Sequence, residues 1–389
     1  MIKYISDSEP KNTTILLRVD FNVSLNGDYT IADDTRIRQS LPTIKLLLKN
    51  HNKLILISHL GRPKGRDPKL SLIKVAVQLA TYIPGFEVAI VDDFLSDRSQ
   101  LVSQQETQLL MLENIRFYDG EKNNDQEFAK ELASLAKAYV DDAFGVCHRE
   151  DASVVGIPML LPSFGGLLLK KEITAMDALL NVPAHPYIAI LAGAKISTKL
   201  PLIHRLLPLV DHLLLGGGLA NTMLLAKGTQ IGKSIAEPDL LDNAKTILAE
   251  AGHKIVLPID AIVGESTDDP TPTNKEIGEI QPSDMILDIG NKTRLLYTEQ
   301  IAQSKTVVWN GPLGYFENPL YRQGSKAICQ AITDTSSATS VIGGGETLAA
   351  IAGSGKLEKI THISTGGGAM LEYLEKGTLP GIEALKITS

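Results

Sequence analysis

Residues 340–371 read SVIGGGETLAAIAGSGKLEKITHISTGGGAML, and this stretch decides the predicted fold. Val341 and Ile342 form an apolar run that enters three glycines, and a helix-forming run follows. The pattern recurs after Ile363, where Gly366, Gly367 and Gly368 precede Ala-Met-Leu. Each copy is typical of a strand, a glycine turn and a helix start, because glycine permits tight turns and a close approach of ligand to backbone. Two such helix starts aimed at one crevice, as in doubly wound sheets, predict a site for a polyphosphate.

Two further glycine turns support this interpretation. The apolar residues 213–215 lead into Gly216, Gly217 and Gly218, and residues 187–191 lead into Ala-Gly193-Ala-Lys195. None of the turns has the Gly-Lys-Ser/Thr ending of a P-loop or a dinucleotide GxGxxG in good context. Tight packing of strand against helix is the alternative explanation of each triplet taken alone.

Length, composition and charge limit the possible classes of protein. A chain of 389 residues exceeds one ordinary core, so two domains are expected. The net charge of −7 argues against nonspecific binding to nucleic acid or to an anionic membrane. Cys147 and Cys329 are far apart and match no metal or redox spacing, which fits a reducing cytoplasm. The first residues lack the apolar core of a signal peptide, and glycines and prolines interrupt the uncharged run 152–169, so we expect no membrane span.

Short apolar runs alternate with helical patterns along the whole chain, which indicates parallel sheets with crossover helices. The expected strands are 15–19, 54–58, 88–91, 109–112 and 139–141 in the first half, and 187–191, 213–215, 255–257, 306–309, 341–342 and 362–364 in the second. Helical patterns include 37–48, 72–82 and 128–138. We therefore predict an α/β protein of two similar-sized lobes, each a parallel sheet flanked by helices, joined by a hinge helix at 166–180. The expected domains are 1–170, with the tail 372–389 packing back onto it, and 171–371.

Polar and basic residues follow the predicted strands of the first half. The strand ends carry Asp20 and Asn22, His59 and Arg62, Arg116, and, further on, Arg149; Arg36 begins a helical pattern. Ligands of parallel sheets bind beyond the carboxyl ends of strands, so these side chains are expected to converge. Such a set suits a small, multiply anionic, hydroxylated ligand. A single arginine after a strand is more often a solvated charge, and His59 alone is equally compatible with a structural role.

With these residues assembled, the sequence resembles the phosphoglycerate kinase family along essentially its whole length. The motifs that carry the resemblance are RVDFNVS (18–24), SHLGRPKG (58–65), ENIRF (113–117), DDAFGVCHR (141–149), GAKISTKL (193–200), LLGGGLANT (214–222), ILDIG (286–290), WNGPLGYFE (309–317), GGGET (343–347) and STGGGA (364–369). The resemblance implies a cytoplasmic, monomeric, hinge-bending glycolytic kinase. Such an enzyme transfers the acyl phosphate of 1,3-bisphosphoglycerate to ADP, reversibly, giving 3-phosphoglycerate and ATP, with Mg²⁺ accompanying the nucleotide.

The resemblance also implies the residues of each site. The first domain would bind the phosphoglycerate through Asp20, Phe21, Asn22, Arg36, His59, Leu60, Gly61, Arg62, Arg116 and Arg149. The second would bind ADP or ATP through Gly193, Lys195, Lys199, Gly217, Asn310, Glu317, Gly344, Gly345, Glu346 and Thr347, with Gly366, Gly367 and Gly368 at a phosphate-facing helix start. Arg36 and Lys199 would be the catalytic pair, and Glu346 the metal ligand.

Three positions depart from the family pattern. Ser24 replaces a usual proline, and Asp141 stands where asparagine is common; neither is expected to touch substrate. Glu346 replaces the usual aspartate of the phosphate turn, which changes how a metal would be coordinated.

The implied chemistry agrees with the residues present. The carboxylate of 3-phosphoglycerate is already deprotonated at neutral pH, so transfer needs positioning and charge neutralisation rather than a general base. Lys195 and Lys199 would share one face if their turn opens a helix, although a surface lysine is the simpler interpretation of Lys199 alone. Trp309 and Tyr315 could stack on adenine, and core packing is an equal alternative for Trp309.

Two other classes remain as alternatives from the sequence. A dinucleotide-dependent oxidoreductase would also use strand–glycine–helix turns, but would want one clean GxGxxG with an acidic residue about twenty positions later. A noncatalytic nucleotide-binding or scaffold protein of the same fold would have lost Arg36, Lys199 or the basic set of the first domain. All of these residues are present.

Overall fold

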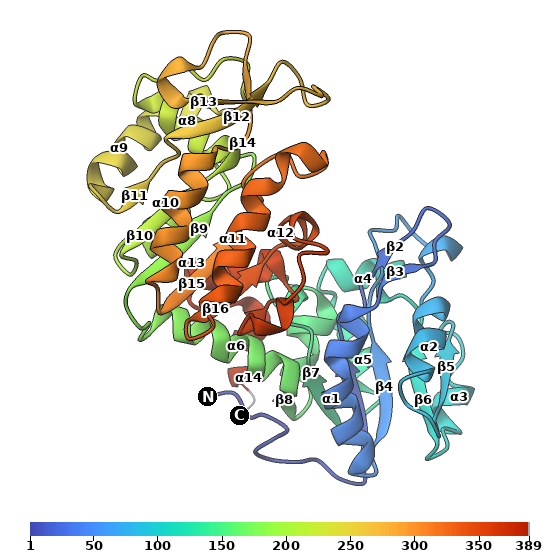
Figure 1. Ribbon diagram of the computed structural model, residues 1–389. Coiled ribbons are helices and arrows are strands. Elements are labelled where there is room, and N and C mark those ends of the chain that lie inside the picture. The colour runs from blue at the N-terminus through green and yellow to red at the C-terminus, as the bar shows by residue number, and fades with distance from the viewer. Residues whose placement is uncertain (388–389) are drawn as a thin grey trace. The chain divides into compact units, whose positions relative to one another are not determined.

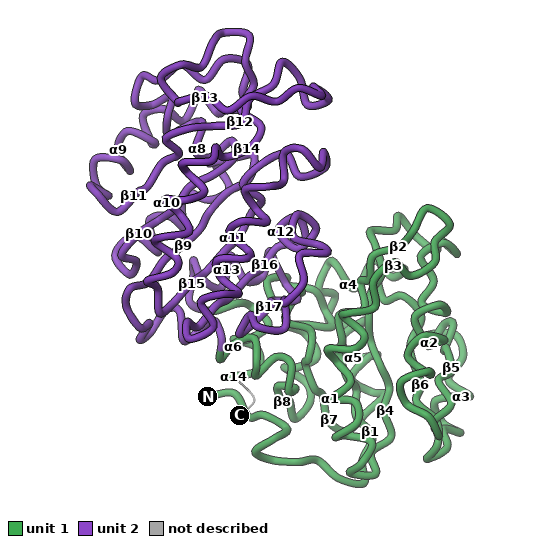
Figure 2. The backbone as a smooth tube through the Cα atoms, viewed as in Figure 1, with its two compact units in different colours: residues 1–174, 378–389 green, residues 175–377 purple. Residues whose placement is uncertain are grey.

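The structure is a computed structural model that describes residues 1–387 (Figure 1). It divides into two compact units, which Figure 2 shows in different colours. Unit 1 comprises residues 1–174 and 378–389, and unit 2 comprises residues 175–377. Of the predicted tail 372–389, residues 388 and 389 lie outside the described residues.

Unit 1 is built on a six-stranded sheet in which every neighbouring pair of strands is parallel. The strand order is β5-β6-β4-β1-β7-β8. The strands are β1 (Thr14–Arg18), β4 (Lys53–Ile57), β5 (Glu87–Val91), β6 (Gln108–Leu112), β7 (Ala138–Asp141) and β8 (Ser163–Gly165). β2 (Ser24–Leu25) and β3 (Ile31–Asp33) form a separate antiparallel ribbon. Arg18, the last residue of β1, pairs with Ile57 and with Asp141, so the carboxyl ends of three strands meet at one edge.

Helices connect these strands and cover the sheet. They are α1 (Thr35–Lys49), α2 (Ile73–Ala80), α3 (Ser99–Val102), α4 (Asp119–Lys122), α5 (Gln126–Ala133) and α14 (Pro380–Ile387), with short helical turns η2 (Ile115–Phe117), η4 (Ala152–Gly156) and η5 (Ile157–Met159). α14 packs on η4, η5 and β8, and the backbone N–H of Gly381 donates to the carbonyl oxygen of Cys147 at 2.9 Å. Helix α6 (Leu167–Leu180) begins in unit 1 and ends in unit 2.

Unit 2 repeats the same plan with a second six-stranded parallel sheet, in the order β11-β10-β9-β15-β16-β17. The strands are β9 (Tyr187–Leu191), β10 (His212–Leu215), β11 (Ile255–Val256), β15 (Thr306–Asn310), β16 (Thr339–Gly343) and β17 (His362–Ile363). A small antiparallel sheet adds β12 (Asp260–Gly264), β13 (Thr273–Glu276) and β14 (Met285–Ile289). The helices are α7 (Leu200–Leu206), α8 (Gly217–Ala226), α9 (Leu241–Ala251), α10 (Asn291–Ala302), α11 (Gln323–Asp334), α12 (Gly345–Ala350) and α13 (Gly367–Lys376).

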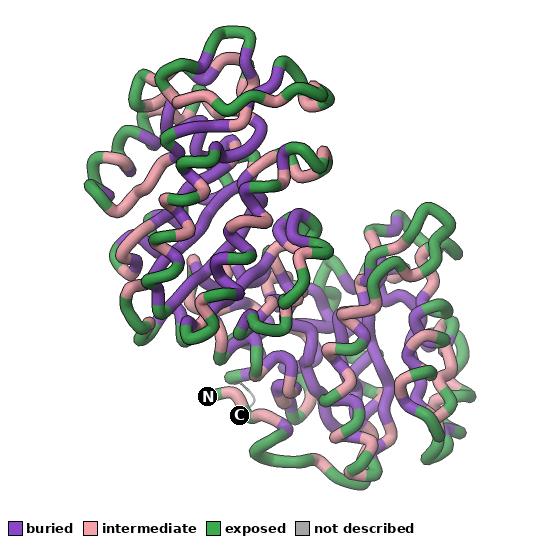
Figure 3. The backbone as a smooth tube through the Cα atoms, viewed as in Figure 1, coloured by how far each residue is buried: buried purple, intermediate pink, exposed green. Residues whose placement is uncertain are grey.

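Both parallel sheets are buried, as Figure 3 shows for each unit. Every residue of β9 and β15 is buried, and four of the five residues of β1 and of β4 are. Strands covered on both faces read as continuous apolar runs rather than alternating ones, which explains why the sequence shows them so plainly. The predicted α/β fold class is confirmed.

The structure corrects two local predictions. The helix expected at 128–138 is α5, which ends at Ala133, because residues from Ala138 onward belong to β7. The turn after β9 does not open a helix at Lys195: α7 begins only at Leu200. Lys195 and Lys199 therefore do not share a helical face, and Lys195 is exposed whereas Lys199 is buried.

Candidate active site

In unit 1 the loops after β1 and β4 are tied together at the carboxyl edge of the sheet. Asp20 follows β1 and accepts a hydrogen bond from Nη1 of Arg36, which lies in the first turn of α1. The backbone N–H of Asn22 donates to Oδ1 of Asp20 at 3.2 Å. Oδ1 of Asn22 in turn accepts from the N–H of Gly61 at 2.8 Å. Asp20, Asn22, Arg36 and Gly61 therefore form one connected network.

His59 lies at the centre of a group of cations. It follows β4 and is buried. Burial holds the pKa of its imidazole well below the ordinary value, and four nearby guanidinium groups add to this effect: Arg18, Arg116, Arg36 and Arg149. The structure thus brings together arginines from β1, α1, η2 and the segment after β7, as the sequence predicted for all of these except Arg18.

Arg116 retains unused hydrogen-bond donors. It sits in η2 after β6, and its Nη1 donates to the carbonyl oxygen of Gly61 at 2.8 Å. Within residues 1–387, its buried Nε and Nη2 atoms meet no hydrogen-bond acceptor, and Asp151 is 3.9 Å from Nη2. Burial and the neighbouring Arg149 lower the pKa of Arg116 to about 10. Buried donors without acceptors are costly, so this cationic cluster is suited to a small anion.

The other predicted residues of unit 1 occupy varied positions. Phe21 and Leu60 have their side chains in the hydrophobic core of the unit, and the N–H of Phe21 donates to Ser58 Oγ at 2.9 Å. Arg149 is half-buried, and Arg62 is exposed. Arg18, which is fully buried at the end of β1, is not among the site residues expected from the sequence. A charged residue closing an otherwise apolar strand was the signal available for it.

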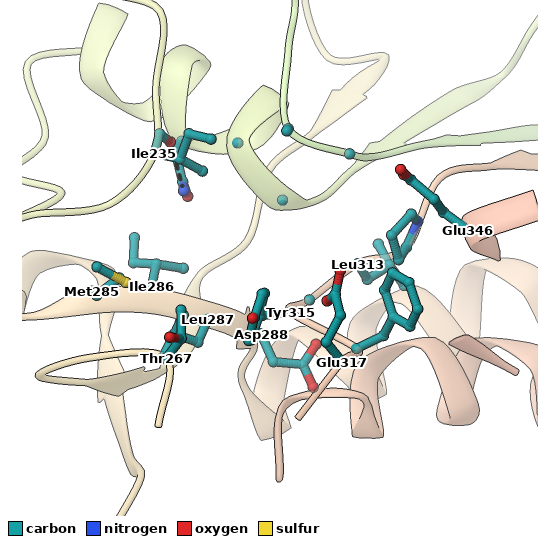
Figure 4. A pocket seen from close by; sticks show the side chains of 18 of the residues that line it. Ile235, Thr267, Met285, Ile286, Leu287, Asp288, Leu313, Tyr315, Glu317 and Glu346 are labelled. Carbon is teal, nitrogen blue, oxygen red and sulfur yellow. Dashed lines mark hydrogen bonds between the residues drawn. The ribbon is translucent and has the colours of Figure 1, made fainter. Parts of the chain in front are cut away.

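Unit 2 contains a cavity of about 450 Å³ between the glycine turns and the small antiparallel sheet. Gly193, Gly217 and Gly218 contribute backbone to its wall, and Met285, Ile286 and Leu287 of β14 contribute side chains. In Figure 4, Met285 and Glu346 stand at opposite ends of the cavity, and Tyr315 and Glu317 lie between them. An apolar cavity with a few polar groups is the usual form of a small-molecule site.

Glycine is required at these turns because one backbone closely approaches another. A Cβ at Gly217, where φ is +61°, would lie 2.8 Å from the carbonyl oxygen of Gly193. A Cβ at Gly367 would lie 2.7 Å from Cα of Gly344, so the turns before α12 and α13 are in contact. The two glycine turns read from the sequence therefore meet at one place.

A hydrogen-bonded network joins this meeting point to Lys199. Nζ of Lys199 donates to Oδ1 of Asn310, and Nδ2 of Asn310 donates to the carbonyl oxygen of Gly343 at 2.8 Å. Thr347 Oγ1 donates to the same carbonyl at 3.0 Å. Burial lowers the pKa of Lys199 to about 8, and the charge of Glu346 acts in the opposite direction.

The cavity and this network divide the predicted nucleotide residues between them. Gly193, Gly217, Glu317 and Glu346 line the cavity. Asn310, Gly344 and Thr347 lie around Lys199, next to the Glu346 end of the cavity. Gly345 and Gly368 are exposed. Gly366 is buried, and its N–H donates to Ser364 Oγ at 3.2 Å.

The two aromatic candidates have different positions. Trp309 is fully buried in the core of unit 2, and its Nε1 donates to the carbonyl oxygen of Gly311 at 2.8 Å. Stacking of Trp309 on adenine is therefore wrong, and core packing is the correct interpretation. Tyr315 lines the cavity and is 37% exposed.

The residues present fit a magnesium ion carried by a nucleotide. Among residues 1–387 there is no cluster of three or more His, Cys, Asp or Glu side chains placed to hold a metal. Glu346 is an exposed carboxylate that lines the cavity. Mg²⁺ bound to substrate phosphates keeps several waters and needs only one or two protein carboxylates, so one glutamate is a sufficient donor.

The described part of the chain also has no helix long and apolar enough to cross a membrane.

Comparison with known proteins identifies the family. A family profile described as Phosphoglycerate kinase matches residues 5–377. The phosphoglycerate kinase of Koribacter versatilis is 47% identical over 396 residues, covering 98% of each chain, and one from Thermus thermophilus is 43% identical over 390 residues, covering 99% of this chain and 100% of the relative. The solved phosphoglycerate kinase of Coxiella burnetii has a TM-score of 0.90 at 36% identity, covering 100% of this chain and 99% of the other.

Two α/β units with parallel sheets, one with an arginine-rich cluster and the other with a glycine-walled cavity, define a phosphotransferase that acts on small molecules. The chain belongs to the phosphoglycerate kinase family. The alternative of a dinucleotide-dependent oxidoreductase is therefore wrong.

Proposed function

We propose that unit 1 holds the phosphoglycerate and unit 2 the nucleotide in the reaction of this family. That reaction is the glycolytic, reversible transfer of the acyl phosphate of 1,3-bisphosphoglycerate to ADP, giving 3-phosphoglycerate and ATP. The observation that carries the proposal is the contrast between the two sites. The cluster around His59 offers arginine donors that a phosphate and a carboxylate can accept, whereas the cavity of unit 2 has the size and apolar lining that suit a nucleoside.

In unit 1 the donors have separate roles. Arg116 and Arg149, with exposed Arg62 at the rim, supply charge to the substrate phosphate. Asp20 and Asn22 hold the loops after β1 and β4 in place and are available to the substrate hydroxyl. Phe21, Leu60 and Gly61 form the floor of the proposed phosphoglycerate site. Arg36 sits in the first turn of α1 and is oriented by Asp20, which suits it to meet the reacting carboxyl end.

In unit 2 the phosphates of the nucleotide lie near Lys199. The Glu346 end of the cavity adjoins Lys199, Asn310 and the turn at Gly344, Gly345 and Thr347. The helix start at Gly366, Gly367 and Gly368 faces the same phosphates, Glu317 serves the ribose, and Lys195 adds charge from the exposed loop before Lys199. Glu346 holds Mg²⁺, which would neutralise phosphate charge when bound.

The transfer itself asks little covalent chemistry of the protein. The carboxylate nucleophile needs no base, so the residues of the chain contribute by orienting the reactants and by stabilising charge on the moving phosphoryl group. Arg36 serves the acid side of this transfer and Lys199 the nucleotide side. Because the two substrates are held on different units, movement at α6 brings them together. The enzyme is proposed to act as a cytoplasmic monomer. Its net charge of −7 supports the absence of nucleic-acid and membrane partners.

A coupled assay tests the proposal: ATP consumption must depend on 3-phosphoglycerate. Arg36→Ala and Lys199→Ala should each lower kcat a hundredfold or more, the loss expected on removing one electrostatic partner of the transition state, about 3–4 kcal/mol. Arg149→Ala should instead raise the KM for 3-phosphoglycerate more than the KM for ATP.

The opposite outcomes are equally clear. A raised KM with unchanged kcat in Arg36→Ala or Lys199→Ala would remove that residue from the catalytic pair. Binding of both substrates without turnover in the wild-type chain would favour the noncatalytic alternative.

A further inference from the structure

Arg18 is a buried cation that the proposed substrate contacts do not use. It ends β1, and its side chain is completely inaccessible to solvent. Its Nη2 atom lies 3.4 Å from Nδ1 of His59 and 3.9 Å from Oε1 of Glu121. Arg18 therefore stands between a fully buried carboxylate and the imidazole at the centre of the anion site.

Glu121 is itself held in place. It lies in α4, and its Oε1 accepts from Ser153 Oγ at 2.6 Å while its Oε2 accepts from the N–H of Ser153 at 2.9 Å. Ser153 belongs to η4, so residues of α4 and η4 hold the Glu121 carboxylate, which forms an ion pair with Nη2 of Arg18 at 3.9 Å, beyond hydrogen-bond distance. Buried charges are tolerated when they are paired and hydrogen-bonded in this way.

The contact with Arg18 assigns the proton of His59. A guanidinium has donors and no acceptor, and it does not lose its proton in proteins. Nδ1 of His59 must therefore accept, and the proton of the neutral ring lies on Nε2. The competing partner for Nδ1 is Oδ1 of Asp20, which is 4.0 Å away, beyond hydrogen-bond distance. Asp20 is also already occupied by Arg36 and by the N–H of Asn22.

We propose that Arg18 is a positioning residue that keeps His59 as the neutral Nε2–H tautomer, so that His59 serves the anionic substrate as a hydrogen-bond donor. The substrate half of this statement rests on the proposed function; the tautomer half rests only on the contacts of Arg18, Glu121 and Ser153.

The surroundings of His59 favour the neutral ring over the imidazolium. Arg18 faces it from β1, Arg36 from α1, Arg116 from η2 and Arg149 from the segment after β7. Asp20 is the nearby carboxylate, and Glu121 and Asp141 interact electrostatically with Arg18. These four guanidinium groups oppose a positive charge on the His59 ring. His59 should thus keep one protonation state across about pH 5 to 8, where an ordinary histidine titrates.

Nitrogen-15 NMR of the imidazole rings tests the assignment in the wild-type enzyme without substrate. Long-range proton–nitrogen spectra separate the two neutral tautomers and the imidazolium, and His59→Gln identifies the signal of His59 among the eight histidines. We expect a protonated Nε2, an unprotonated Nδ1 and no titration across about pH 5 to 8. A proton on Nδ1, or a doubly protonated ring at neutral pH, overturns the proposal.

Arg18→Lys separates the hydrogen bond from the charge. Lysine keeps the cation, but its compact ammonium pairs with Glu121 and no longer bridges to His59. We expect the His59 signals to become a mixture of both tautomers, and the KM for 3-phosphoglycerate to rise roughly tenfold, with a smaller change in kcat. Unchanged tautomer signals in Arg18→Lys overturn the positioning role. Glu121→Gln is the milder matched variant, since it preserves shape, and should give a smaller mixture of the same kind.

Titration with 3-phosphoglycerate distinguishes the two halves. A pure Nε2–H ring whose signals move on binding supports both. A pure Nε2–H ring that does not respond to 3-phosphoglycerate contradicts the substrate role of His59 and leaves the tautomer assignment standing.

Discussion

Lys199 is a buried cation whose pKa burial lowers to about 8. A lysine loses its charge as pH rises through its pKa, so the free enzyme should lose catalytic efficiency above about pH 8. We expect kcat/KM for the nucleotide to be level below this value and to fall above it. Bound phosphates favour the charged amine, so the fall in kcat should lie at higher pH than the fall in kcat/KM.

The matched control is Lys199→Arg. Arginine stays charged throughout the range, so the alkaline fall should disappear even where the overall rate is lower. If Lys199→Arg retains the same alkaline fall, another group is responsible for it. If the wild-type profile stays level well above pH 8, Lys199 does not carry the charge on which transfer depends.

Substitution of Glu346 tests whether its carboxylate binds Mg²⁺. If its carboxylate binds Mg²⁺, Glu346→Gln should raise the Mg²⁺ concentration needed for half-maximal activity, whereas Glu346→Asp should largely keep it. Calorimetry gives an independent readout: Glu346→Gln should weaken binding of Mg·ADP more than binding of free ADP. Equal effects on both ligands would leave Glu346 only the role of complementing the first turn of α12, worth at most about 1 kcal/mol.

Among the elements, the contact between the turns before α12 and α13 gives a sharp stability prediction. A methyl group at Gly367 would collide with backbone of Gly344 at 2.7 Å, and backbone cannot move aside as a flexible side chain can. Gly367→Ala should therefore lower the free energy of unfolding by about 1–3 kcal/mol in urea titration.

Gly368 provides the control next to it. Nothing lies within 4 Å of the position that its Cβ would take, and it lies within α13. Gly368→Ala should leave the free energy of unfolding unchanged or raise it by about 0.5–1 kcal/mol, because alanine loses less backbone entropy in a helix. Equal destabilisation by both substitutions would show that the contact with Gly344 is not what requires glycine.

The elements differ in how far the sequence predicts them. Strands of the parallel sheets are visible because both of their faces are buried and their sequences are continuous apolar runs. The antiparallel sheet of unit 2 was missed: β13 reads TNKE, and its pattern is that of an exposed loop. β8 was missed because its three residues, SFG, are too short to show a period.

The residues of the candidate site also differ in how far the sequence predicts them. Arg36, His59 and Arg116 could be selected because parallel strands bring their carboxyl ends to one edge. Arg18 was not selected: its charge at the end of an apolar strand is visible in the sequence, but its contacts with Glu121 and His59 join residues that are far apart in the chain. Lys199 could be chosen through the family resemblance, but its burial and its bond to Asn310 are long-range facts that neither the turn nor its spacing contains.

For the whole molecule, the proposal that the two substrates are held on separate units predicts a change in overall dimension during turnover. Transfer needs the two substrates in contact and water excluded, and α6 is the element shared by both units. Small-angle scattering should give a smaller radius of gyration with 3-phosphoglycerate and nucleotide together than with either alone. 3-Phosphoglycerate with ADP does not react and provides the ternary state in the wild-type enzyme. An unchanged radius would contradict hinge closure.

The path of the chain through the two units also determines which unit can complete its fold first during translation. Residues 378–387 belong to unit 1, yet the ribosome makes them after the whole of unit 2. Leu379, Ile382 and Leu385 are buried, and α14 packs on η4 and on β8. Unit 2 is continuous in sequence and can close its core while translation proceeds, whereas unit 1 leaves an apolar surface uncovered until α14 emerges. Unit 1 is therefore begun first but completed last. A nascent chain stalled before residue 378 should engage chaperones through unit 1.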